Sequence, residues 1–357
     1  MKNPSSPQCI SSDMRLILCS ALSALVILLP GATANAASAT WNASPTDGNW
    51  VTDGSENNWG TGVGTSPGAT SGTTNTDTAT FNNASATTAI TINSPTLNVD
   101  NITFDTATGS YTLSGGGLLL TAGGTIQLSG TVTSTGKTET IGTPITLEGN
   151  YTFANNSTTS DVLNFGTAGT ITSGGTTGAT TLTLAGANTG SNIINSVISN
   201  GSGSNLVGVT KSGAGTWILA GANTFGGPLT ISTGVLQLAN ASASGTGTVT
   251  VNANNGLAFG QGIGTFTLGA LAGTGSLVLA DTGGNAVTLQ VGGNNASTTY
   301  SGVISGPGGL TMNGLGTLIL SNTADNIFGG LTINSGTVEA SGAGQSYGPL
   351  FVAAGAT

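Results

Sequence analysis

The sequence is poor in charge, and it contains no histidine. Charged side chains make up 5% of the 357 residues, with 4 Lys and Arg against 13 Asp and Glu. Beyond residue 36 the basic residues are Lys137 and Lys211. Proteins bind nucleic acid and anionic membranes through clustered Lys and Arg, which neutralise phosphates. The composition therefore argues against both of these partners.

Cysteine is confined to the first 36 residues, at Cys9 and Cys19. This segment is typical of a cleaved signal peptide, because an apolar run over residues 16–29 is followed by small residues at Ala34 and Ala36. The run is too short to span a bilayer as a permanent helix, which takes about 20 apolar residues. We expect cleavage after Ala36, an exported mature chain without disulfides, and no stable membrane insertion by this chain.

The residue types that most enzymes use are missing from the mature chain. Without histidine a Ser-His-Asp triad is impossible, and without Cys or His a zinc site has none of its usual ligands. Neither the EF-hand pattern nor the GGxGxDxUx calcium repeat occurs, and Asp281, in the segment DTGGN, is interpreted as an isolated turn. Glycine strings such as GPGG at 306–309 lack a following helix and lysine, so they predict turns and not phosphate loops. The sequence predicts a non-enzymatic protein with no catalytic residues, no metal and no cofactor.

Carboxylates are the remaining route to catalysis, since β-helical enzymes that act on acidic polysaccharides use them. The acids closest in sequence are Asp47, Asp53 and Glu56, followed by Asp100 and Asp105. The last two are five positions apart, so within one strand they would face opposite sides. We interpret all five as turn or surface residues.

Glycine is abundant, with 60 residues, and hydrophobic residues make up 37% of the chain. The glycines follow no three-residue period, which excludes a collagen helix, and the hydrophobic content argues against disorder. Apolar residues instead alternate with Thr, Ser or Gln in short runs, which predicts strands with Leu, Ile or Val facing inward. No helix is predicted after residue 36. The clearest strand runs are 89–92, 111–113, 125–128, 145–147, 180–184, 216–219, 229–231, 235–238, 248–251, 265–268, 276–279, 286–291, 317–320 and 331–333.

Two pairs of similar segments show that the chain is built from repeats. TLTLAGANT at 181–189 is answered by TWILAGANT at 216–224, and GVTKSGAGTWIL at 208–219 is answered by GLTMNGLGTLIL at 309–320. Short strands alone permit a sandwich, a barrel or a solenoid, but repeats whose indels fall in turns favour a solenoid. With roughly 20 to 25 residues assumed per coil, we expect an all-β parallel β-helix of about 13 coils.

Tryptophan is concentrated ahead of the strand-rich part, at Trp41, Trp50 and Trp59. A solenoid needs its first coil covered, because an open end exposes the core and unpaired strand edges. We therefore predict a Trp-rich N-terminal cap over residues 37–85, between the signal peptide (1–36) and the β-helix region (86–357). The alternative is that these indoles form a platform for a sugar ring, in a carbohydrate-binding or carbohydrate-active β-helix that works through carboxylates.

Paired threonines offer a further alternative. T-x-T pairs occur at 131–133, 181–183, 248–250 and 265–267. Stacked on one outward face, such pairs would form the flat array of an ice-binding solenoid. Their spacing in the sequence is irregular, however, and Thr is a favoured strand residue in any case.

The segment KSGAGTWILAGANTFGG at 211–227, followed by LTI at 229–231 and GVLQL at 234–238, closely resembles the autotransporter-associated β-strand repeat. That family has the pattern K-x-G-x-G-T-L-x-L-x-G-x-N-T-Y-x-G-x-T-x-I-x-x-G-T-L-x-L. A second unit at 313–340 is similar, with Met312 at the lysine position. The opening segment from Trp41 resembles the N-terminal portion of large exported proteins that carry this repeat.

The resemblance implies a right-handed parallel β-helix of the autotransporter passenger type. It implies a structural or adhesive role, secreted or on the cell surface in association with the outer membrane of a Gram-negative-type bacterium. Its partners would then be surface glycans, extracellular matrix or other cells. Autotransporter passengers are followed by a C-terminal barrel, whereas this sequence ends at 351–357 partway through a further repeat. We therefore expect a truncated product or a barrel encoded elsewhere, and not autotransport by this chain itself.

Overall fold

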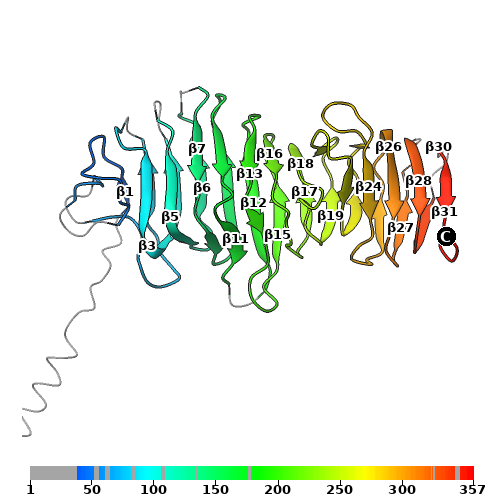
Figure 1. Ribbon diagram of the computed structural model, residues 1–357, viewed down its shortest axis with the longest axis horizontal. Coiled ribbons are helices and arrows are strands. Elements are labelled where there is room, and N and C mark those ends of the chain that lie inside the picture. The colour runs from blue at the N-terminus through cyan, green and yellow to red at the C-terminus, as the bar shows by residue number, and fades with distance from the viewer. Residues whose placement is uncertain are drawn as a thin grey trace, which may run out of the picture. The chain divides into compact units, whose positions relative to one another are not determined.

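The computed structural model describes residues 38–51, 56–60, 65–82, 85–105, 109–132, 135–175, 178–322, 324, 326–341 and 346–357. Within these residues every named element is a β-strand, and the named strands pair in parallel. The strands follow one another in chain order along a solenoid (Figure 1). The predicted signal peptide, 1–36, lies outside the described residues.

The strands form three sheets of 13, 11 and 7 strands. The first sheet contains β1 (Ala39–Thr40), β2 (Thr78–Phe81), β4 (Asn101–Phe104), β6 (Thr125–Leu128), β9 (Tyr151–Asn155), β12 (Thr180–Gly186), β15 (Val207–Lys211), β17 (Leu229–Ile231), β19 (Thr248–Val251), β22 (Ala270–Gly273), β25 (Thr298–Tyr300), β27 (Thr317–Leu320) and β29 (Thr337–Ala340). The second contains β3 (Ala89–Val99), β5 (Thr112–Leu120), β7 (Thr138–Ile141), β8 (Ile145–Leu147), β10 (Val162–Phe165), β11 (Thr170–Ser173), β13 (Asn192–Ile194), β14 (Val197–Ile198), β16 (Thr216–Leu219), β18 (Val235–Leu238) and β20 (Leu257–Phe259). The third contains β21 (Thr265–Thr267), β23 (Leu277–Val278), β24 (Thr288–Val291), β26 (Ile304–Met312), β28 (Ile327–Ile333), β30 (Ser346–Tyr347) and β31 (Leu350–Val352).

The first sheet gives the length of each coil, because its strands pair in register from one coil to the next. Leu229 of β17 pairs with Val249 of β19, 20 positions further along the chain. In a longer central coil Phe153 of β9 pairs with Leu184 of β12, 31 positions further along. The parallel β-solenoid is therefore confirmed, with about 11 turns. The expected number of about 13 was too high because loops lengthen several central coils beyond the assumed range.

Alternation along each strand directs every second side chain into the solenoid. In β6, Ile126 and Leu128 are buried, whereas Thr125 and Gln127 are half-buried. Register pairing then stacks apolar side chains of successive coils, as where Ile126 lies beside Ile102. Each buried Leu or Ile contributes about 1.5–3 kcal/mol relative to an exposed one. The predicted inward Leu, Ile and Val and outward Thr, Ser and Gln are thus confirmed in this strand.

The turns that follow β15 and β17 in successive coils both require glycine. Gly213 and Gly234 have φ angles of 73° and 70°, in the left-handed region that disfavours other residues. A Cβ atom on Gly234 would lie 2.4 Å from the carbonyl oxygen of Gly213, and one on Gly213 would lie 2.5 Å from that of Gly186. Glycines of successive coils therefore stack too closely for a side chain, which explains why the repeat keeps them at fixed places.

Most predicted strand runs coincide with strands or overlap them, and 125–128, 216–219 and 248–251 match β6, β16 and β19 in full. The interpretation of GPGG at 306–309 as a turn was wrong, because these residues lie inside β26. The pairing of β26 with β28 shifts register between Gly306 and Gly309, so the strand accommodates Pro307 at an irregularity. The glycine and proline residues at 306–309 therefore lie at a distortion within the strand and not at its end.

Three tryptophans pack together at the start of the described chain. Trp41, Trp50 and Trp59 are fully buried, and all three rings contact Phe81 of β2, with centroid distances of 6.1, 5.6 and 5.5 Å. Phe81 in turn stacks on Phe104 of β4 at 5.3 Å. The indoles therefore continue the interior of the first coils. A cap over residues 37–85 stays a prediction.

Candidate functional site

One acid of the predicted carboxylate grouping near residue 50, Asp47, stabilises a turn. Asp47 accepts hydrogen bonds from the backbone N–H and the side chain of Asn49, at 2.8 and 2.6 Å, and from the side chain of Asn58 at 2.7 Å. Asn58 is fully buried. Glu56 is half-buried, and Asp53 lies outside the described residues. With three donors already on its oxygens, Asp47 is engaged in local structure.

Asp100 and Asp105 lie at opposite ends of β4, one before the strand and one after it. Asp100 accepts a hydrogen bond from the Asn101 side chain at 2.8 Å, and partial burial raises the pKa of its carboxyl above the ordinary value. Asp105 accepts a hydrogen bond from the Thr131 hydroxyl. The structure therefore places these two acids at separate turns.

Asp281 lies in a turn, as the DTGGN segment indicates. Its carboxylate accepts backbone N–H groups of Gly262, Gly283 and Asn285, at 3.1, 2.8 and 2.9 Å. These donors, Gly262 first among them, hold the pKa of Asp281 below its ordinary value. The hydrogen-bond donors to this carboxylate are thus amide groups of the chain itself.

A buried acid that the sequence reasoning did not identify lies inside the solenoid. Glu139 is at an inward position of β7, and its Oε2 accepts the backbone N–H of Tyr111 at 2.5 Å. Burial, assisted by repulsion from Asp161, raises its pKa to about 8. Asp161 is also buried, and it accepts the backbone N–H of Lys137 at 2.6 Å. The sequence did contain a signal for this burial: in TETI at 138–141, Glu139 lies two positions before Ile141 and therefore on the same inward face of the strand.

Lys211, the lysine of the repeat, is buried at an inward position of β15. Its ammonium group donates to the carbonyl oxygens of Ser212, Gly213 and Thr233, at 2.9, 2.8 and 3.2 Å. Burial lowers the pKa of Lys211 to about 8. This lysine therefore ties the turn of one coil to the turn of the next, and Met312 takes a corresponding inward position in β26.

The tryptophan platform has no geometric support. The indole N–H groups of Trp41, Trp50 and Trp59 donate to backbone carbonyl oxygens at 3.1, 2.8 and 2.8 Å, and the rings are fully buried. A sugar ring stacks on an aromatic face that solvent can reach. These faces are covered by protein.

On the described part of the first sheet, threonine forms a continuous outward column at one register position and not a double row. Thr181 and Thr248, which begin two of the T-x-T pairs, pair with Gly208 and Ala270, so their column is interrupted. The ice-binding alternative therefore lacks a flat double row. Six threonines do stack in register on the first sheet, at Thr125, Thr152, Thr183, Thr210, Thr230 and Thr250.

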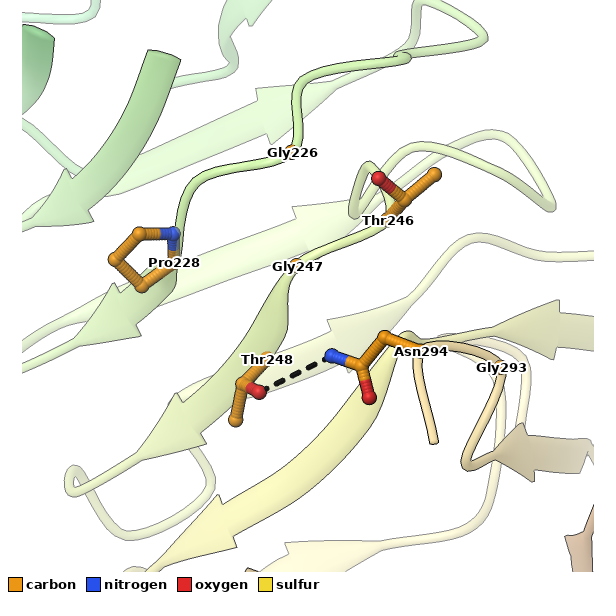
Figure 2. A pocket seen from close by; sticks show the side chains of 7 residues that line it. All are labelled: Gly226, Pro228, Thr246, Gly247, Thr248, Gly293 and Asn294. Atoms are coloured by element: carbon orange, nitrogen blue, oxygen red, sulfur yellow. Dashed lines mark hydrogen bonds between the residues drawn. The ribbon is translucent and has the colours of Figure 1, made fainter. Parts of the chain in front are cut away.

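A surface groove of about 520 Å³ lies beside the starts of β17 and β19 (Figure 2). We call it the Pro228 groove. The Asn294 side chain donates a hydrogen bond to the Thr248 hydroxyl at 3.2 Å, joining the loop after β24 to the first sheet. The groove is lined by Gly226, Pro228, Thr246, Gly247, Thr248, Gly293 and Asn294. No sequence motif pointed to it, because its residues come from three separate segments, 226–228, 246–248 and 293–294.

Two general properties concern metals and membranes. In the part of the chain that the structure describes, His, Cys, Asp and Glu side chains form no group of three that could hold a metal ion. No helix long and apolar enough to cross a membrane occurs among the described residues.

Residues 209–238 and 310–340 match the family model described as the passenger-associated-transport repeat. The first match runs from β15 to the end of β18, and the second from β26 to the end of β29. Each copy therefore spans four consecutive strands, although β15 lies in the first sheet and β26 in the third.

The chain is also 30% identical, over 226 residues, to the adhesin BmaC autotransporter of Brucella suis biovar 1 (strain 1330). The alignment covers 57% of this chain and 6% of that protein, so the chain spans a small part of its relative's length. No solved structure matches the chain.

Proposed function

We propose that this chain, which carries two passenger-associated-transport repeats, is an exported, non-enzymatic surface protein with an adhesive role. The observation that carries the proposal is the combination of a parallel β-solenoid with repeats that match the passenger-associated family, at 209–238 and 310–340. A relative named as an adhesin and autotransporter supports the same role. The place of action is the surface of a Gram-negative-type bacterium or its surroundings.

The site geometry supports a binding role over catalysis. Asp47 and Asp281 use their oxygens on local N–H donors, and Asp100 and Asp105 lie at separate turns. Hydrolysis of a glycosidic bond takes two carboxyl groups about 5–10 Å apart on either side of the scissile bond. A long solenoid instead offers an extended surface of stacked coils, which suits adhesion.

Adhesion can be tested with beads coated with residues 37–357 of the chain. We expect these beads to be retained on cultured cells or on extracellular matrix, and beads coated with the heat-unfolded chain to be retained much less. Antibody labelling of intact bacteria tests the surface location. A reducing-sugar assay on a panel of polysaccharides tests the enzymatic alternative, and release of product would overturn the non-enzymatic proposal.

A further inference from the structure

We propose that the Pro228 groove binds a segment of an uncharged glycan. The proposal names a partner class for the adhesive role, and it rests on that role. The volume of about 520 Å³ falls within the roughly 300–1,000 Å³ typical of small-ligand sites. The groove is the place where the loop at Gly293 and Asn294 lies against the start of β19, so its residues come from different coils (Figure 2).

One wall presents hydrogen-bonding groups to a ligand. Asn294 uses one amide hydrogen on Thr248, and its Oδ1 accepts the backbone N–H of Ala296 at 3.0 Å. The second amide hydrogen of Asn294 and the hydroxyl hydrogen of Thr248 remain for ligand or water. Thr246, which is exposed, adds a hydroxyl that can accept. Neutral amides and hydroxyls of this kind pair with sugar hydroxyls, which both donate and accept.

The other wall contains the exposed ring of Pro228, which supplies an aliphatic surface. Just outside the lining residues, Asn200 and the 39% exposed Leu206 lie beside Gly226, where a Cβ atom would be 3.2 Å from Asn200 Nδ2 and 3.4 Å from Leu206 Cδ2. A pyranose ring has an apolar face of C–H groups together with its hydroxyls. An aliphatic surface opposite neutral hydrogen-bonding groups therefore matches both parts of a sugar, and ligand sites commonly combine the two.

Charge separates an uncharged glycan from an acidic one. Between Asp161 and Asp281 the only charged residue is Lys211, and between Asp281 and Asp325 there is none. Lys211 is buried on backbone carbonyls and does not reach the surface. The negatively charged groups of a sulfated or uronic-acid glycan would thus lose their hydration at this surface without gaining contact with a positively charged side chain. A neutral glycan pays no such penalty.

Gly293 leaves space in the groove, although the backbone at this position does not require a glycine. A Cβ atom on Gly293 would meet only the carbonyl oxygen of Leu268, at 3.8 Å, an ordinary contact. By contrast, a Cβ atom on Gly247 would lie 2.0 Å from the carbonyl oxygen of Gly227. The fold therefore tolerates a side chain at position 293, which lines the groove. Gly117 of β5, whose Cβ atom would lie 3.6 Å from the carbonyl oxygen of Pro144, offers a matched site elsewhere.

The test compares the full mature chain with Gly293→Val and the control Gly117→Val on an array of neutral, sialylated and sulfated glycans. We expect the parent chain and Gly117→Val to bind neutral glycans equally, and Gly293→Val to bind them at least tenfold more weakly. Raising NaCl from about 0.05 M to about 0.5 M should leave this binding unchanged, since no ion pair is screened. Far-UV circular dichroism checks that both variants are folded.

Three outcomes on the array would overturn the proposal: no glycan bound, binding confined to acidic glycans, or equal binding by Gly293→Val. The bead assay separates this failure from failure of the adhesive role. If beads adhere to cells and no neutral glycan is bound, the adhesive role stands and the glycan site falls. If beads also fail to adhere, both fall.

Discussion

The buried Glu139 predicts an unusual dependence of stability on pH. Its folded pKa is about 8, against an ordinary value of 4.5. Between pH 4.5 and about pH 8, Glu139 keeps its proton in the folded chain and loses it in the unfolded chain. Unfolding therefore releases a proton, and the free energy of unfolding falls as pH rises. Each pKa unit corresponds to about 1.4 kcal/mol. From about pH 5 to about pH 7, Glu139 should therefore lower the free energy of unfolding by about 3 kcal/mol.

Replacement by glutamine tests this reasoning. Glu139→Gln keeps an oxygen to accept the Tyr111 N–H, as the protonated acid does, but it cannot ionise. Three charged or titratable groups face this position: Asp161 raises the pKa of Glu139, Lys137 lowers it, and Tyr111 supplies the amide. We expect the variant to match the parent at about pH 5 and to exceed it in stability by about 3 kcal/mol at about pH 7.

The assay is guanidinium unfolding followed by circular dichroism at several pH values. Glu339→Gln, which changes an exposed glutamate of β29, is the control and should keep the slope of the parent chain. If Glu139→Gln shows the same pH slope as the parent, or loses stability at high pH, then this carboxyl is not held protonated inside the solenoid.

Three further predictions concern the core, the repeat lysine and the glycine stack. Trp59→Ala removes a fully buried indole and should cost about 3–5 kcal/mol in guanidinium unfolding; a loss below about 1 kcal/mol would show that the aromatic cluster is not packed as described. The parent chain should become more stable as pH rises from about 8 to 10.5, because in this range Lys211 is neutral in the folded chain and charged in the unfolded chain. Lys211→Met should abolish this rise in stability. A variant that keeps the rise would refute the burial of this lysine. Gly234→Ala should lower the thermal midpoint through its φ of 70° and its contact with Gly213, whereas Gly293→Ala should leave it unchanged; equal effects would contradict the stacked turn.

Much of the fold could be predicted because it depends on local alternation. The pattern of TIQL at 125–128 gives both the strand and its buried face, and the repeat copies give the stacking. Strand β13 (Asn192–Ile194) escaped prediction because its residues do not alternate between polar and apolar: the polar Asn192 takes an inward, buried position in phase with Ile194. The strand over GPGG escaped because a register irregularity, which depends on the neighbouring coil, accommodates residues that usually end strands.

The candidate site was far less predictable than the fold. Asp47 and Asp281 accept hydrogen bonds from donors a few residues away in their own turns, which agrees with their interpretation as turn residues because such bonds depend on local sequence. The Pro228 groove depends on how far a loop of one coil reaches over another, as Asn294 does over Thr248. Loop length and coil stacking together set that distance, and a single sequence does not encode it in any local pattern.

The central claim is that successive coils stack in parallel and in register, and engineered disulfides test it directly. Thr183 pairs with Thr210, and Thr210 with Thr230, so neighbours in this column are about 4.8 Å apart and next-neighbours about twice as far. A disulfide requires Cα atoms about 4.4–6.8 Å apart. With no other cysteine after residue 36, the double variant Thr183→Cys/Thr210→Cys should oxidise to an intramolecular disulfide while Thr183→Cys/Thr230→Cys should not. Equal oxidation of both pairs, or oxidation of the second alone, would contradict the solenoid.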